Sequence, residues 1–190
     1  MVIVMKMSEE QPQRKLAPCV FWLYGLSGSG KTTLSRLAAA ELSSAGIPCL
    51  ILDGDDFRSG ISSDLGFSAE DRTENIRRAA EIAELACRQG LVVLAAFITP
   101  EIAMRDMARR IISSGPFFEV YLSCNYETFA SRDVKGLYRK ASEGALRQFT
   151  GKDSAFEPPV QPDLAIDSGI AEKDQCISDL RAFILEKCLL

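Results

Sequence analysis

The sequence predicts an α/β fold whose central sheet has about five strands and is mostly parallel. Short runs rich in apolar residues alternate with helical stretches along the whole chain, a pattern typical of strand–helix–strand units. Most of these runs are continuously apolar, as expected for strands that helices cover on both faces. With 190 residues, 47% of them hydrophobic and 25% charged, the chain has the size and balance of one three-layer domain.

Five apolar runs are the candidate strands. They span residues 19–24, 49–52, 91–97, 117–122 and 164–166. Four helices are expected between and after them, over residues 34–45, 68–90, 101–113 and 172–187.

Helical spacing also predicts which side chains face the sheet. In the helix over 68–90, Ser68 is the expected N-cap. Its expected buried line is Ile76, Ala79, Ala83 and Cys87. The expected buried line of the helix over 101–113 is Ala103, Met107 and Ile111.

Composition excludes several kinds of site and partner. The chain contains no histidine, which excludes Ser-His-Asp and Cys-His catalysis and histidine-ligated zinc. Its net charge of −4 argues against nucleic acid or an anionic membrane as a partner. The six cysteines form no CxxC pair, so we expect reduced thiols. A cytoplasmic location is expected, with a plastid or another reducing organelle as the alternative.

One domain is expected over residues 18–190, after a flexible segment over 1–17 that lacks the pattern of a secretory signal. Within that domain, residues 132–162 are polar and contain glycine and proline, and six basic residues lie between positions 132 and 152. We expect this stretch to form a mobile lid.

The strongest motif follows the first expected strand directly. Residues 25–32 have the sequence GLSGSGKT, which matches G-x-x-x-x-G-K-[ST] and opens a helix. The glycines let the backbone curve around phosphate, whose charge meets successive N–H groups and the helix N-terminus. Lys31 would reach the β- and γ-phosphates, and Thr32 would supply an oxygen to Mg²⁺. A Gly/Ser turn that binds nothing is the alternative, but strand, motif and helix occur in the required order. We therefore predict a P-loop NTPase fold.

The rest of the chain selects among P-loop proteins. Common GTPases need an Asn-Lys-x-Asp segment, yet the only asparagines, Asn75 and Asn125, are not followed by lysine. A transporter-type ATPase would carry a Leu-Ser-Gly-Gly segment, which is also absent. The short length and the basic lid favour a small kinase.

An acidic turn, DGDDFR, follows the second expected strand at residues 53–58. In a parallel sheet this strand end lies beside the phosphate loop. A carboxylate there could accept a proton from an attacking hydroxyl or hold a water on Mg²⁺. A solvated turn without function is the alternative.

Two polar residues extend the buried line of the next helix backwards, towards the same sheet edge. These are Arg72 and Asn75, and Arg58 is a second cation nearby. They could face an anionic ligand, or they could form a structural ion pair or cap. The pattern gives Arg77 and Arg78 no role, and a solvated position is one interpretation.

Several long motifs together resemble adenylyl-sulfate kinases, over about residues 18–168. The motifs are GLSGSGKTTL, LDGDDFRSGI, SSDLGFSAEDRTENIRRAAEIA, FITP, RDVKGLYRKA and FTGKDSAFEPP. The resemblance implies transfer of the γ-phosphate of ATP to the ribose 3′-hydroxyl of adenosine 5′-phosphosulfate (APS). The products would be ADP and the 3′-phosphorylated compound (PAPS), in sulfate activation.

The resemblance also implies roles for individual residues. Asp55 would be the base, with Lys31 and Asp53 in the catalytic machinery. Thr32 and Asp53 would support Mg²⁺, the implied cofactor. ATP would be bound by Gly25, Ser27, Gly28, Ser29, Gly30, Lys31, Thr32, Thr33 and Arg132. APS would be bound by Asp55, Arg58, Phe67, Arg72, Asn75, Ile98, Thr99, Lys135 and Phe149, with its adenine between the two phenylalanines.

Four positions depart from the family pattern: Asp56, Thr99, Glu101 and Lys152 stand where the family usually has asparagine, serine, an aromatic residue and an aliphatic residue. The changes at Asp56 and Glu101 keep open a kinase of the same architecture that acts on another small anionic or sugar hydroxyl. A third interpretation is a nucleotide-binding regulatory protein without turnover. The expected partners are ATP and APS, a second copy of the chain in a homodimer and a possible functional link to ATP sulfurylase, with no nucleic acid and no membrane.

Overall fold

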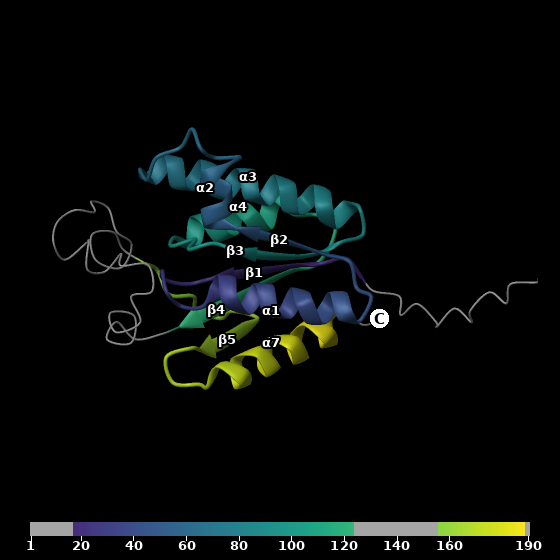
Figure 1. Cartoon of the computed structure of the whole chain (residues 1–190). Helices are drawn as coiled ribbons and strands as arrows, with labels where there is room; N and C mark the ends of the chain where they lie inside the picture. The colour runs from purple at the N-terminus through teal and green to yellow at the C-terminus, as the bar shows by residue number, and fades with distance from the viewer. Residues whose placement is uncertain (1–16, 124–155, 189–190) are drawn as a thin grey trace, which may run out of the picture.

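The computed structural model describes residues 17–123 and 156–188, which form a three-layer α/β domain (Figure 1). Five strands make one sheet of order β2-β3-β1-β4-β5, in which every neighbouring pair is parallel. The strands are β1 (Val20–Tyr24), β2 (Cys49–Asp53), β3 (Val92–Ala96), β4 (Phe117–Ser123) and β5 (Leu164–Asp167). The predicted five-stranded α/β fold is thus confirmed.

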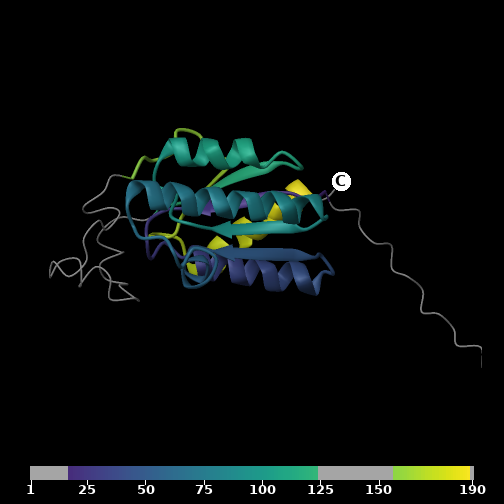
Figure 2. The ribbon, with the colours of Figure 1, turned by 90° about the horizontal axis from the view of Figure 1, so that it is seen from above.

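Helices cover both faces of the sheet, as Figure 2 shows from above. The helices are α1 (Lys31–Ser44), α2 (Gly54–Ser59), α3 (Ala69–Arg88), α4 (Ile102–Ile111) and α7 (Lys173–Cys188). One apolar cluster lies between the sheet and α3 with α4, and a second lies between the sheet and α1 with α7. Within the described residues, no helix is both long and apolar enough to cross a membrane.

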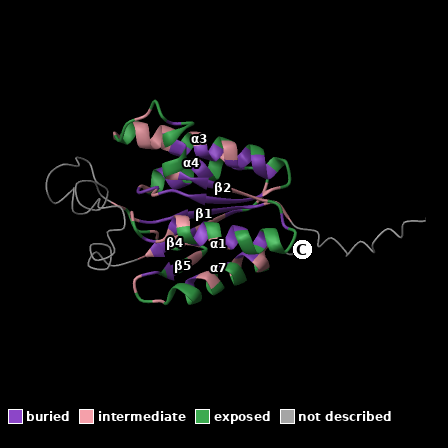
Figure 3. Ribbon diagram, viewed as in Figure 1, coloured by how far each residue is buried: buried purple, intermediate pink, exposed green. Residues whose placement is uncertain are grey.

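Strand β1 lies at the centre of the sheet and is buried along its whole length (Figure 3). Its alternate side chains enter different clusters: Trp22 packs on the α3 side and Phe21 on the α1 side. This explains why the run is continuously apolar. The strand also ends directly before the phosphate loop, so the best-buried strand of the domain carries that loop.

Two predictions about local structure were wrong. Residues 54–59 form the helix α2 and not a turn, because the Asp53 side chain caps the helix by accepting a hydrogen bond from the Asp55 amide. On α4 the prediction was wrong for Ala103, which is exposed, whereas Met107 and Ile111 pack against the core as expected. The fully buried face of α4 is Met104, Arg105 and Ala108. A purely apolar stripe could not predict this face, because one of its members is an arginine. The flexible segment over 1–17 and the lid over 132–162 lie largely outside the described residues.

Candidate active site

The phosphate loop connects β1 to α1, as the motif predicted. Gly25, Gly28 and Gly30 adopt positive φ angles of 148°, 84° and 89°. Residues other than glycine rarely adopt such backbone angles. A Cβ atom on Gly25 would also clash with the carbonyl oxygen of Leu122. Both observations explain why glycine is required at this position.

The Lys31 side chain lies folded against the loop that it follows. Its Nζ donates hydrogen bonds to the carbonyl oxygens of Gly25 and Leu26 at 2.9 and 2.7 Å, and Ser29 Oγ lies 3.3 Å away. Lys31 is only 8% exposed. The ammonium group is therefore held at the loop itself, where the oxygens of a phosphate chain could compete for its protons.

A short hydrogen bond joins the phosphate loop to the end of β2. Thr32 Oγ1 donates to Asp53 Oδ2 at 2.6 Å, and Asp53 Oδ1 accepts from the Asp55 amide at 2.9 Å. Asp53 is 4% exposed, whereas Asp55 is exposed at the start of α2. A hydroxyl and a carboxylate oxygen are ligands that Mg²⁺ accepts. The residues present therefore fit this ion, either directly or through its waters.

Two arginines lie around Phe67, at the end of the connection between α2 and α3. The Arg58 guanidinium stacks on the Phe67 ring at 4.3 Å and donates a hydrogen bond to the Gly66 carbonyl oxygen. Arg72 Nε donates to the Phe67 carbonyl oxygen at 3.0 Å. The Phe67 ring itself is 59% exposed. An aromatic ring is thus presented to solvent, with one of its faces covered by a cation.

Burial lowers the pKa of both guanidinium groups, because it disfavours their charged form. It lowers the pKa of Arg58, and the positive charge of Arg72 lowers it further. Burial also lowers the pKa of Arg72, while the nearby Glu101 carboxylate acts in the opposite direction. Two half-buried cations that repel each other would be stabilised by a ligand carrying negative charge.

Asn75 lies one helical turn beyond Arg72 on α3. It is 4% exposed, and its Oδ1 has no hydrogen-bond partner among the residues that the structure describes. A buried amide oxygen without a partner is costly. A ligand that donates a hydrogen bond would remove this cost.

The segment after β3 contains a strained residue. Thr99 has a φ angle of 41°, which is unfavourable for a β-branched residue and costs about 1–3 kcal/mol. Its hydroxyl accepts a hydrogen bond from Trp22 Nε1 at 2.9 Å, and its carbonyl oxygen accepts from Arg105 at 3.0 Å. Ile98, which precedes it, accepts a hydrogen bond from the Gly25 amide at 3.4 Å. Ile98 and Thr99 are thus tied to the phosphate loop and to the core.

Arg105 is a residue of this site that the sequence pattern missed. It is 2% exposed and donates to the carbonyl oxygens of Thr99 and Glu157 at 3.0 and 2.8 Å. Glu157 also forms two hydrogen bonds with the segment between β3 and α4. Its amide donates to the Pro100 carbonyl oxygen, and its carboxylate accepts from the Ile102 amide. The signal in the sequence was weak, since an arginine on a helix usually lies at the surface.

The structure brings most of the predicted site residues to the same edge of the sheet. This edge is formed by the carboxyl ends of parallel strands, where ligands of open α/β sheets bind. Ser27, Gly28, Ser29 and Thr33 belong to the loop and the first turn of α1. Arg132, Lys135 and Phe149, together with the departure at Lys152, lie outside the described residues.

With this geometry established, comparison with known proteins decides the family. The family model for adenylylsulphate kinase matches residues 17–167. The chain belongs to the adenylylsulphate kinase family. This match confirms the family and the kinase function that the sequence predicted, and it argues against a nucleotide-binding protein without turnover.

Individual relatives agree with this assignment. The adenylyl-sulfate kinase of Bacillus velezensis is 45% identical over 176 residues, covering 93% of this chain and 89% of that protein. The enzyme of Geotalea uraniireducens is 48% identical over 167 residues, covering 88% and 80%. The structure of the Mycobacterium tuberculosis APS kinase in complex with AMPPNP and APS matches with a TM-score of 0.83 at 37% identity, covering 90% of this chain and 98% of that one.

Five of the six cysteines lie in the described residues, and none of these five forms a disulfide there. Four are buried, and Cys49 is partly buried. Burial raises the pKa of Cys49 and of Cys87. These thiols behave as small apolar groups of the core.

Proposed function

We propose that the chain transfers the γ-phosphate of ATP to the ribose 3′-hydroxyl of APS at the sheet edge described above, with Asp55 as the general base. The 3′-oxygen would form a bond to the γ-phosphorus while the bond from that phosphorus to the β,γ-bridging oxygen breaks. The hydroxyl proton would pass to the Asp55 carboxylate. The products are PAPS and ADP.

One observation carries this proposal: the hydrogen bond from Thr32 to Asp53 places the acidic start of α2 beside the phosphate loop. Asp55 follows two residues later, with its amide fixed by Asp53. A base must be within reach of the proton that it accepts. The helix α2 carries Asp55 at its start, beside the phosphate loop, and Arg58 one turn later. Family membership independently supports the same acceptor.

The donor half of the site would be the phosphate loop. Its amide groups and the N-terminus of α1 would bind the phosphate chain, and Lys31 would move from the loop carbonyls to phosphate oxygens. Thr32 and Asp53 would hold Mg²⁺. When bound, this ion would neutralise negative charge on the β- and γ-phosphates.

The acceptor half would be formed by α2, α3 and the segment after β3. Arg58 and Arg72 would bind the phosphosulfate group, and the Asn75 amide oxygen would accept a hydrogen bond from the ligand. Phe67 would stack on the adenine from one side. Ile98 and Thr99 would line the pocket by their backbone. For Arg132, Lys135 and Phe149, the resemblance supports roles in the lid and in the second half of the adenine stack.

A direct assay tests the proposal. The purified chain, Mg²⁺ and ATP would be incubated with APS and, in parallel, with AMP, adenosine and a panel of sugars, and both ADP and the phosphorylated product would be measured. We expect rapid turnover with APS alone and a product with the mass of PAPS. Turnover only with another acceptor would contradict the proposal and favour a retuned pocket, with Asp56 and Glu101 as the first positions to revert.

Three wider expectations are part of the same proposal. The family resemblance supports a homodimer, a cytoplasmic enzyme and a functional link with ATP sulfurylase, the enzyme that would supply APS. Sedimentation analysis tests the first. For the last, a coupled assay would compare PAPS formation from sulfate with and without added ATP sulfurylase.

A further inference from the structure

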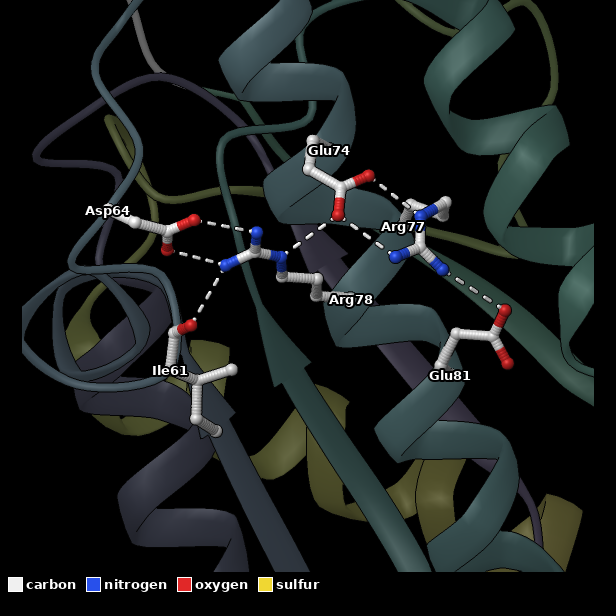
Figure 4. A network of polar contacts seen from close by, with 6 residues as sticks. All are labelled: Ile61, Asp64, Glu74, Arg77, Arg78 and Glu81. Carbon is white, nitrogen blue, oxygen red and sulfur yellow. Dashed lines mark hydrogen bonds and ion pairs between the residues drawn. The ribbon is translucent and has the colours of Figure 1, made fainter.

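We propose that Arg78 is a positioning residue for the APS site, because it anchors the loop of residues 61–66, which directly precedes Phe67. This inference rests on the proposed function, since it concerns the acceptor that Phe67 would bind. Neither the sequence pattern nor the family match assigned Arg78 a role. Its contacts, drawn in Figure 4, supply the reason.

The Arg78 guanidinium connects α3 to the loop in front of it. It binds both carboxylate oxygens of Asp64, at 2.6 and 2.8 Å, and donates to the Ile61 carbonyl oxygen at 3.0 Å. On its own helix it donates to Glu74 at 2.9 Å. A two-pronged guanidinium–carboxylate contact fixes orientation as well as distance, which a lysine cannot do. Only 25% of the Arg78 side chain is exposed.

The adjacent Arg77 provides a natural contrast. Its hydrogen bonds go to Glu74 and Glu81, which lie on the same helix (Figure 4). It therefore shares a carboxylate partner with Arg78, but within the described residues it forms no hydrogen bond or ion pair with the loop. Pairs of this kind stabilise a helix by only a few tenths of a kcal/mol. The two arginines differ chiefly in the contact with residues 61–64.

The loop needs an anchor that stays in place when substrate binds. Its far end is held by Arg58 and Arg72, through the carbonyl oxygens of Gly66 and Phe67. If these two arginines bind the phosphosulfate group, some of their donors are drawn away from those carbonyls. Arg78 binds the other part of the loop through separate partners, so it can keep the loop in register with α3 throughout the cycle.

Phe67 depends on this register because the ring has little other support. It is 59% exposed and contacts Arg58 on one face. The loop also contains Ser62, which is fully buried and whose hydroxyl has no hydrogen-bond partner within residues 17–123 and 156–188. Ile61 is exposed as well, and a loop whose large apolar side chains are exposed is expected to shift when a polar anchor is removed.

The test compares three variants by steady-state kinetics with each substrate varied in turn. Arg78→Met should raise the KM for APS about tenfold, because a small displacement of the Phe67 ring weakens its contact with the substrate. The KM for ATP and the kcat should stay within about twofold. Arg77→Met should match the wild type. Asp64→Asn, at a side chain that is 60% exposed, should raise the KM for APS in the same direction and to a smaller extent, without endangering the fold.

A second experiment asks whether Arg78 acts through Phe67. Phe67→Ala should itself raise the KM for APS, and adding Arg78→Met to that variant should change it no further. Full additivity of the two substitutions would overturn the proposal, because it would mean that Arg78 acts by another route. A fall in kcat with both KM values unchanged would also overturn it, since that is the signature of a smaller folded fraction.

The outcomes separate this inference from the proposed function. If the wild type turns over APS and Arg78→Met behaves as Arg77→Met does, only the role of Arg78 is refuted. If the wild type does not turn over APS, the proposed function and this inference are both refuted.

Discussion

The two halves of the site are held in place in different ways. The phosphate loop is fixed by local geometry: three glycines with positive φ, the start of α1 and a lysine bound to carbonyls of its own loop. The acceptor half is assembled from α2, the 61–66 loop, α3 and the segment after β3, which are connected by side chains. Arg58, Arg72, Arg78 and Arg105 make most of these connections.

This difference indicates how each half should respond to change. In the phosphate loop, a substitution at a single glycine changes the backbone geometry and should weaken phosphate binding. In the network of arginines, loss of one side chain should displace groups that lie several residues away. Substitutions that act on one half and spare the other therefore test the comparison.

The largest effect is expected where the two halves meet, at Asp55. Asp55→Asn should lower kcat about a thousandfold, because a general base contributes roughly 10²–10⁴ in rate, while the KM for ATP changes little. The matched control is Asp56→Asn, since Asp56 is exposed and its carboxylate lies 3.7 Å from the exposed Arg36. Rapid-quench measurement of the chemical step would show the loss. Near-normal turnover of Asp55→Asn would remove Asp55 from the role of base.

The next effect concerns the network around Thr99. Arg105→Met should lower the free energy of unfolding by about 1–3 kcal/mol, because it leaves the carbonyl oxygens of the buried Thr99 and of Glu157 without their donor. Arg109→Met is the control: Arg109 pairs with Glu119, at 2.8 Å, but is 45% exposed. It should cost less than about 1 kcal/mol. Urea denaturation measures both, and equal losses would contradict a special role for Arg105.

The sequence predicted the position of the phosphate loop almost completely and the arrangement of residues 58–75 only in part. The motif at residues 25–32 specifies backbone geometry, and backbone geometry is local, so spacing alone was sufficient. The position of Arg72 and Asn75 near the start of α3 was also predicted, because they extend an apolar stripe of known period. Arg105 and Glu157 were missed because their partners are 6 to 55 residues away in the chain, and no local pattern records such contacts.

A smaller effect should separate metal binding from nucleotide binding. Thr32→Val removes the hydroxyl that donates to Asp53. It should raise the Mg²⁺ concentration needed for half-maximal activity about tenfold, as loss of a metal-orienting group does. At saturating Mg²⁺ the KM for APS should be unchanged. A titration of activity with Mg²⁺ checks this, and an unchanged requirement would contradict the assignment of Thr32 to the metal.

The smallest effect is expected at Glu101, one of the departures from the family pattern. Its carboxylate raises the pKa of Arg72 and so partly offsets the charge that would attract an anion. Glu101→Gln should lower the KM for APS by about twofold, since the two groups are partly exposed and screened. The effect should vanish at high ionic strength. A raised KM would show that Glu101 assists binding instead.

The central claim is that residues 58–75 form an acceptor site separate from the phosphate loop, and Phe67→Ala tests it most directly. The measurement is a full matrix of initial rates with APS and ATP varied together. The account predicts a KM for APS raised about tenfold, as expected for loss of a stacking face, with the KM for ATP within twofold of the wild type. An equal rise in both KM values, or no rise in either, would contradict it.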